Sequence, residues 1–197
     1  IMGKAMSRVD IPAKVDGSAF YGLDYNTDDM LFAAIRLAPV FGTKLVSVDA
    51  TEALKRRGVK KVIELKDSVA VVADNYWRAK EALKVVAAQF ERSDNDSVSS
   101  ADIAARFDAE LARSEGRKDF EAGDAEANLT QASEIVEASY RVPYLAHAPM
   151  EPMNCTVHIQ NGRADVWTST QDPLAVRGRV ASVAGLNERA VTHHPSY

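Results

Sequence analysis

Cysteine is nearly absent from this sequence, because Cys155 is the only one among 197 residues. A single thiol cannot form a disulfide within the chain, and it cannot build a metal site that needs several thiolate ligands. Cysteine usage therefore indicates neither an oxidising nor a reducing compartment.

An excess of either charge is also missing. The sequence has 24 Lys and Arg residues against 28 Asp and Glu residues, so its formal net charge is −4. Such a balance offers no basic surface of the kind that binds nucleic acid or an anionic membrane. Apolar stretches stay well below the roughly 20 residues that a bilayer-spanning helix needs. We therefore expect no nucleic-acid partner and no membrane insertion.

Glycine and proline, with 10 and 7 residues, are too few to suggest a repetitive or disordered chain. Gly3, Gly17, Gly22 and Gly42 lie at turn positions, without the strand, glycine loop and helix of a phosphate-binding motif. The hydrophobic fraction of 46% and the charged fraction of 26% are ordinary for globular proteins. The chain is long enough for one large domain or two small ones.

Strand patterns alternate with helix-forming stretches in residues 1–91. The nearly continuous apolar run of residues 30–37 is typical of a strand that is covered on both faces. Asn75 stands where it can cap a following helix. The mixture predicts one compact domain of the α/β or α+β kind. The expected strands cover residues 19–25, 30–37, 45–48, 59–65, 69–73 and 85–90, and the expected helices cover residues 49–57 and the stretch after Asn75.

Polar residues dominate from 92 to 100 and predict a connection between two regions. Ser100 can cap a helix over residues 101–113, so we expect a connecting segment with a helix over residues 92–119. Residues 120–197 then predict a second mixed unit. Its expected elements are a strand at 135–142, a hairpin of residues 154–159 and 164–168 around Asn161 and Gly162, and a helix at 173–184.

A hydrolase site is one interpretation of His147, Glu151 and Cys155, which would supply a base, an orienting carboxylate and a nucleophile. Cys155 opens an alternating strand pattern, where a lone cysteine more commonly has a packing role. Nothing in the sequence supplies an oxyanion hole. The packing role is therefore the favoured interpretation of Cys155.

His193 and His194 could in principle bind a metal. Adjacent residues on a strand point to opposite faces, however, so the two rings cannot easily share one ion. We expect no metal site at this pair.

Two segments have residue types that suit a binding site. Residues 144–155 combine His147, Glu151 and prolines without a helix or strand period, which predicts a rigid, irregular backbone. Thr170 and Gln171 stand where a strand ends and a helix begins, a place where α/β proteins position ligands. A stiff loop without a binding role is the alternative for the first segment.

These segments resemble the xanthine dehydrogenase and aldehyde oxidase family, most closely the large subunit of the isoquinoline 1-oxidoreductase type. The resemblance runs over nearly the whole chain. It begins with Gly3-Lys4, Lys14-Val15-Asp16-Gly17 and Tyr21-Gly22-Leu23-Asp24, and it is most specific at Met150-Glu151-Pro152 and at Ser169-Thr170-Gln171.

The resemblance implies an α+β chain with an α/β-hammerhead domain over residues 1–91. A connecting segment would follow over residues 92–119, and the beginning of the first molybdopterin-binding domain over residues 120–197. The implied cofactor is molybdopterin with its molybdenum. Gln171 would lie beside the molybdenum, where its amide can bond an oxo ligand, with Thr170 next to it. The implied wall of the active site contains His147, Met150 and Glu151.

The implied reaction is hydroxylation of an aldehyde or an electron-poor N-heterocycle, with water as the oxygen source. Electrons would leave through an iron–sulfur small subunit, because one cysteine cannot ligate such clusters. The family's glycine-rich loop is expected near Val191, and neither it nor the later catalytic glutamate occurs in these residues. We therefore expect this stretch alone to be inactive and to bind no cofactor, and to need the rest of a large subunit.

The alternative is a self-contained α+β domain that binds a protein partner without redox chemistry. The resemblance implies a bacterial parent protein. The compartment stays open between cytoplasm and periplasm, because relatives of the isoquinoline type often have an export signal.

Overall fold

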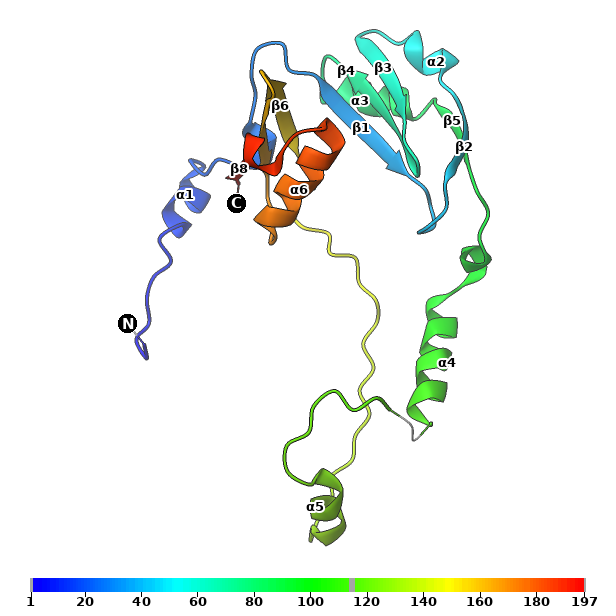
Figure 1. Cartoon of the computed structure of the whole chain (residues 1–197), viewed down its shortest axis with the longest axis vertical. Helices are drawn as coiled ribbons and strands as arrows, with labels where there is room; N and C mark the ends of the chain where they lie inside the picture. The colour runs from blue at the N-terminus through cyan, green and yellow to red at the C-terminus, as the bar shows by residue number, and fades with distance from the viewer. Residues whose placement is uncertain (1, 114–115, 197) are drawn as a thin grey trace. The chain divides into compact units, whose positions relative to one another are not determined.

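The computed structural model describes residues 2–113 and 116–196 and has two compact units. One unit joins the two ends of the sequence, Ile1–Met30 and His147–Tyr197, and the other is the continuous stretch Leu31–Ala146. Both contain helices and strands (Figure 1), which confirms the predicted α+β class.

The Leu31–Ala146 unit is built around an antiparallel sheet in the order β1-β4-β3, whose strands are Phe32–Leu37, Ser68–Ala73 and Val59–Glu64. A second antiparallel pair joins β2 (Leu45–Asp49) to β5 (Ala87–Phe90). The helices among these strands are α2 (Thr51–Leu54) and α3 (Tyr76–Leu83). All the strands predicted between residues 30 and 90 are therefore confirmed, with small differences in their ends.

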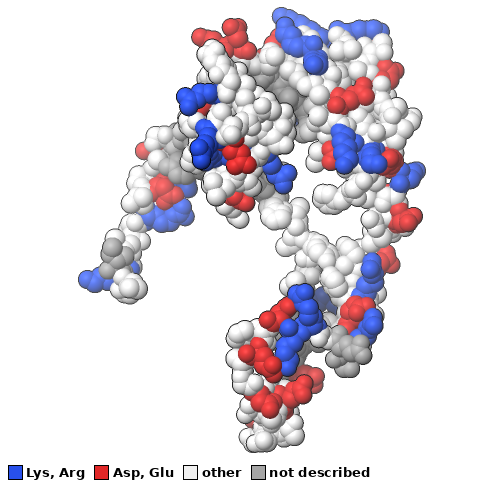
Figure 2. Space-filling view, in the orientation of Figure 1, with Lys and Arg blue, Asp and Glu red and all other residues white. Residues whose placement is uncertain are grey.

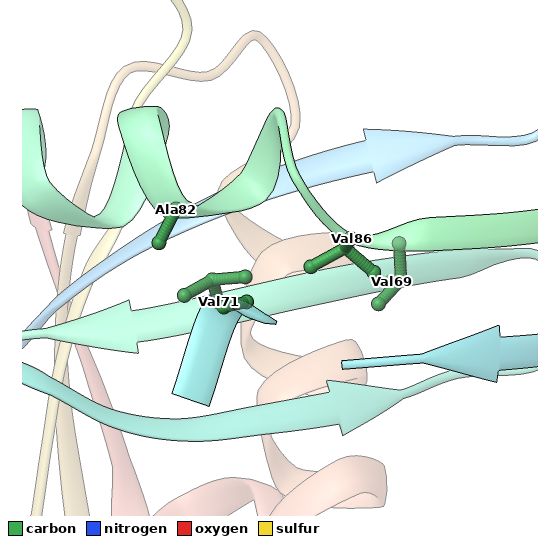
Figure 3. Packing of buried hydrophobic residues seen from close by; sticks show 5 residues of the cluster. Val69, Val71, Ala82 and Val86 are labelled. Carbon is green, nitrogen blue, oxygen red and sulfur yellow. The ribbon is translucent and has the colours of Figure 1, made fainter. Parts of the chain in front are cut away.

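The core of this unit lies between the central strand β4 and α3. Val69 and Val71 of β4 are fully buried, and Ala82 and Val86 pack against them from α3 and the chain after it (Figure 3). Asn75 caps α3 as predicted, because its side-chain oxygen accepts a 2.9 Å hydrogen bond from the Arg78 N–H.

Two predictions in this unit are wrong in part. Residues 32–37 of the predicted run form β1, but this strand is covered on one face only. Ala34 is buried in the cluster with α3, whereas Ile35 and Leu37 are 55% and 62% exposed. The helix predicted over residues 49–57 is limited to α2, Thr51–Leu54.

Beyond β5 come a short 3-10 helix η2 (Asp94–Ser97), then α4 (Ser100–Leu111) and α5 (Ala125–Gln131). The cap of α4 is Ser99 rather than the predicted Ser100. Ser99 Oγ accepts from the Asp102 N–H, and the Asp102 carboxylate accepts from the Ser99 N–H, which forms a capping box.

The strand predicted at residues 135–142 does not form. No strand is assigned between residues 134 and 149, all of which the structure describes. The alternating apolar side chains of this stretch remain exposed, with Val136 at 88% and Tyr140 at 92%. The pattern is that of a strand, but no neighbouring strand pairs with it in the described part of the chain.

The unit of the two chain ends contains a three-stranded sheet in the order β6-β7-β8, formed by Thr156–Gln160, Arg163–Thr168 and Val191–Pro195. Strands β6 and β7 form the predicted hairpin, with left-handed backbone at Asn161 and Gly162. Strands β7 and β8 are parallel and are connected by α6 (Pro173–Ala184) and the 3-10 helix η3 (Glu188–Ala190). Helix α6 covers the predicted residues 173–184 and is followed by Gly185, whose backbone is left-handed.

Ala164, Val166 and Val191 of the sheet form the core of this unit with Ala181 of α6. The N-terminal stretch supplies helix α1 (Ile11–Asp16) and the 3-10 helix η1 (Gly22–Asp24). The strand predicted at residues 19–25 is wrong, because the Tyr21 N–H bonds to the Asp24 carboxylate and closes a turn.

The predicted domains grouped residues 1–30 with the first domain, whereas in the structure these residues cluster with 147–197. No helix in the described ranges has the length and hydropathy of a membrane span.

Candidate functional site

The parallel pair β7 and β8 creates an edge at which two strand ends meet. Thr168 at the end of β7 is in register with Pro195 at the end of β8. After β7, residues 169–172 turn the chain into α6. Loops at the carboxyl ends of parallel strands are where open α/β sheets bind ligands. The predicted site residues Thr170 and Gln171 lie in this turn.

The turn is closed by its own side chains. Thr170 Oγ1 accepts a 3.0 Å hydrogen bond from the Asp172 N–H, and Asp172 Oδ1 accepts one of 3.0 Å from the Ala175 N–H. Asp172 is thus the cap of α6, and Pro173 begins the helix. The exposed amide of Gln171 has no hydrogen-bond partner among the described residues. Its donors and acceptor are free to bind a ligand.

The two histidines of β8 contact strand β7 beside this turn. His193 Nε2 lies 3.0 Å from the Thr168 carbonyl oxygen, at the last residue of β7. His194 Nε2 lies 2.8 Å from Asp165 Oδ1, and its ring stacks on Trp167 with centroids 4.8 Å apart. Each histidine has its own partner. Within the described ranges, no group of three or more metal-ligating side chains could hold a metal ion.

Cys155 does not have the environment of a nucleophile. Partial desolvation raises the pKa of its thiol, and an interaction with Thr168 opposes this more weakly. Reactive cysteines need the opposite shift, because the thiolate is the nucleophile. In the described part of the chain, no hydrogen bond joins His147 to Cys155 or to Glu151. The geometry gives the hydrolase interpretation no support.

The three residues predicted as an active-site wall have different surroundings. His147 and Met150 are exposed. Glu151 is half-buried, and its Oε1 accepts hydrogen bonds from the Leu23 N–H at 3.2 Å and from Asn154 Nδ2 at 2.8 Å. Glu151 therefore contacts η1 and its own loop.

Sequence reasoning missed Asn154 and Gly22. Asn154 Oδ1 is buried without a hydrogen-bond partner, and it lies against Gly22, where a Cβ would overlap it. The backbone oxygen of Asn154 accepts a 2.8 Å hydrogen bond from Thr168 Oγ1. The signal was present in the segment 144–155, which contains Asn154, but its partner Gly22 lies far away in the sequence.

The Leu31–Ala146 unit has a groove of about 720 Å³ between α4 and residues 140–144. Phe107, Leu111 and Tyr140 contribute apolar surface, and Arg141 forms a 2.7 Å ion pair with Asp108 at its side. Over the face seen in Figure 2, positive and negative side chains are interspersed, without a patch of one sign. The groove has no cluster of catalytic groups.

Comparison with known proteins connects residues 108–197 to the family described as "Molybdopterin cofactor-binding domain". The matched range begins inside the predicted connecting segment, earlier than residue 120. The chain is 28% identical to isoquinoline 1-oxidoreductase subunit beta of Brevundimonas diminuta, over 98% of this chain and 26% of that protein. It is 30% identical to the nicotinate dehydrogenase large molybdopterin subunit of Eubacterium barkeri, over 94% of this chain and 51% of that protein.

Solved structures show the same fold at lower identity. Quinoline 2-oxidoreductase from Pseudomonas putida 86 matches with a TM-score of 0.68 and 18% identity, over 98% of this chain and 30% of that one. Aldehyde oxidoreductase from Desulfovibrio gigas matches with a TM-score of 0.70 and 19% identity, over 96% of this chain and 26% of that one. The chain thus spans between a quarter and about half of these proteins.

Proposed function

We propose that the chain forms part of a cofactor site in an oxidoreductase. The basis is that it belongs to the molybdopterin-binding large subunits of the xanthine dehydrogenase and aldehyde oxidase family. The substrate class is an aldehyde or an electron-poor N-heterocycle, in agreement with the names of the relatives. The observation that carries the proposal is the exposed Gln171 amide at the edge of a parallel strand pair, inside the matched range 108–197.

The residues of the turn fit a polar cofactor. Gln171 offers two N–H donors and one carbonyl acceptor, and Thr170 adds a hydroxyl. The single carboxylate of the turn, Asp172, caps α6 through its Oδ1. The N-terminus of α6, a helix of 12 residues, begins directly after it and favours negative groups nearby.

When bound, the cofactor supplies the redox chemistry by which oxygen from water enters a C–H bond of the substrate. The role of this chain is to position it. Gln171 would donate hydrogen bonds to the polar edge of the cofactor and hold its orientation. Electrons would pass to an iron–sulfur subunit, since the single Cys155 cannot ligate such a cluster.

The test is turnover by the holoenzyme that contains this chain, with Gln171→Ala and Gln171→Glu compared at matched molybdenum content. A lost preorganised donor costs roughly 10² to 10³ in rate in well-studied enzymes, so we expect a loss near 10² for Gln171→Ala. Gln171→Glu should be worse, because a carboxylate can only accept hydrogen bonds.

The matched control is Gln160→Ala, at the hairpin end of β6, where the side chain is also exposed. It should keep wild-type turnover. If both Gln171 variants keep it as well, Gln171 is only a turn residue. Absence of molybdenum and pterin from the purified protein that contains this chain would instead favour the alternative of a protein-interaction domain.

A further inference from the structure

The family resemblance implies that Glu151 belongs to the active-site wall. In the structure its carboxylate contacts Leu23 of η1 and Asn154. We propose that Glu151 and Asn154 are positioning residues, which join η1 to the carboxyl end of β7 and thereby fix the turn that presents Gln171. The inference rests on the proposed role of Gln171 for its effect on turnover. Its structural part, the joining of η1 to β7, stands independently.

The carboxylate of Glu151 bridges two segments that are 128 residues apart at their contact. Its Oε1 accepts from the Leu23 N–H at 3.2 Å and from Asn154 Nδ2 at 2.8 Å. Hydrogen bonds to an ionised acceptor are stronger than neutral ones. No ion pair with Lys or Arg is found for Glu151 in the described part of the chain, so these N–H groups are its polar partners.

Asn154 is held in one orientation by its donors. Nδ2 donates to Glu151 Oε1 and, at 3.0 Å, to the Pro152 carbonyl oxygen. The opposite side of the amide, Oδ1, then faces the Cα of Gly22, because a Cβ built there would overlap it. Oδ1 is buried without a hydrogen-bond partner, and only a residue that lacks a side chain fits beside it at position 22.

The backbone of Asn154 connects the contact with Gly22 to the candidate site. Its carbonyl oxygen accepts from Thr168 Oγ1 at 2.8 Å. The carbonyl oxygen of Thr168 is in turn within 3.0 Å of His193 Nε2, and Ser169 Oγ is within 3.2 Å of Ser196 Oγ. The last residue of β7 is thus held from the loop and from β8, three residues before Gln171.

Amide hydrogen exchange of the holoenzyme tests the joining directly. Glu151→Ala removes the acceptor of the Leu23 N–H, and a hydrogen bond to a charged group is worth enough to slow opening about tenfold. We expect exchange to become about tenfold faster in peptides covering residues 22–25 and 168–172, with no change in peptides from β4. Glu151→Gln keeps an acceptor oxygen and should restore most of the protection.

Glu188→Ala is the matched control, because Glu188 is an exposed glutamate of the same unit. It should leave both peptides unchanged. Gly22→Ala should act like Glu151→Ala, since the new methyl must displace the Asn154 amide. The double variant Gly22→Ala/Asn154→Ala should exchange little faster in these peptides than either single variant, because both changes break the same contact.

Turnover separates positioning from contact with the substrate. Glu151→Ala should lower kcat about tenfold with little change in KM, and Glu151→Gln should recover it. Faster exchange at residues 22–25 alone would overturn the link to β7. Lost turnover without any change in exchange would make Glu151 part of the cofactor site. Wild-type turnover of Gln171→Ala, with the exchange pattern intact, would refute the proposed role of Gln171 and leave the joining of η1 to β7 in place.

Discussion

Buried valines of β4 show how much a single side chain contributes to the Leu31–Ala146 unit. Val71 has no exposed surface and packs among Ala53, Ala82 and Val86. Its two γ-methyl groups are worth about 0.8 kcal/mol each in transfer, and the cavity left behind adds to this. Val71→Ala should therefore lower the free energy of unfolding by about 2 to 3 kcal/mol. Denaturant titration measures this loss. The control is Val46→Ala, because Val46 is 62% exposed and its replacement should cost little.

Asn75 makes a smaller and more local contribution. Its Oδ1 accepts from the Arg78 N–H at the start of α3. Asn75→Ala should cost about 1 kcal/mol of stability, and Asn75→Asp should cost much less, because aspartate caps equally well. Equal losses in the two variants, measured by thermal unfolding, would mean that the cap contributes nothing.

At the scale of elements, helix α4 should depend on pH through its capping box. Hydrogen bonds from the side chain and backbone of Ser99 hold the pKa of Asp102 below its ordinary value of 3.8. A depressed carboxyl pKa in the folded state means that the stabilisation is present above pH 3.8 and is lost as the pH falls through the lower folded value.

The expected result is a less stable first turn of α4 as the pH falls below about 4, seen as moderately faster amide exchange in residues 100–111 after correction for intrinsic rates. Asp102→Asn cannot titrate, so its α4 should lack this component. An identical pH profile in the variant would show that other carboxyl groups control the helix.

The stretch of residues 134–149 should exchange its amides far faster than β4. It has no strand partner in the described part of the chain, whereas β4 is central in its sheet. Exchange in water by mass spectrometry measures the difference. Slow exchange in residues 134–149 of the holoenzyme, against fast exchange in the isolated chain, would indicate that another part of the protein pairs with it.

Local signals explain which elements could be predicted. Asn75 and the Asn161-Gly162 turn act within a few residues, so the sequence alone indicates the elements that they bound. The segment 135–142 has the same quality of pattern but failed, because a strand exists only where another strand pairs with it.

At the scale of the whole molecule, some residues of the candidate site are placed by local sequence and others by contacts between distant segments. The place of Gln171 in the turn between β7 and α6 was predictable because a strand end and a helix start follow each other along the chain. The partners Leu23 and Glu151 were not, because they are 128 residues apart and neither residue type specifies the other. The one-sided burial of β1 has a similar origin, since only the folded sheet shows that α3 covers a single face.

The discontinuous unit has a consequence for synthesis on the ribosome. Residues 31–146 are contiguous and can fold as soon as they emerge, whereas residues 1–30 must wait for residues 147–197, which are translated later. At about 5 to 20 residues per second, the 128 residues between Leu23 and Glu151 take roughly 6 to 25 seconds to make. During that interval residues 22–24 lack the contacts with Glu151 and Asn154 that hold them in the finished structure, so this stretch is available to chaperones or to a wrong partner. Residues 31–146 therefore fold before residues 1–30, although residues 1–30 leave the ribosome earlier.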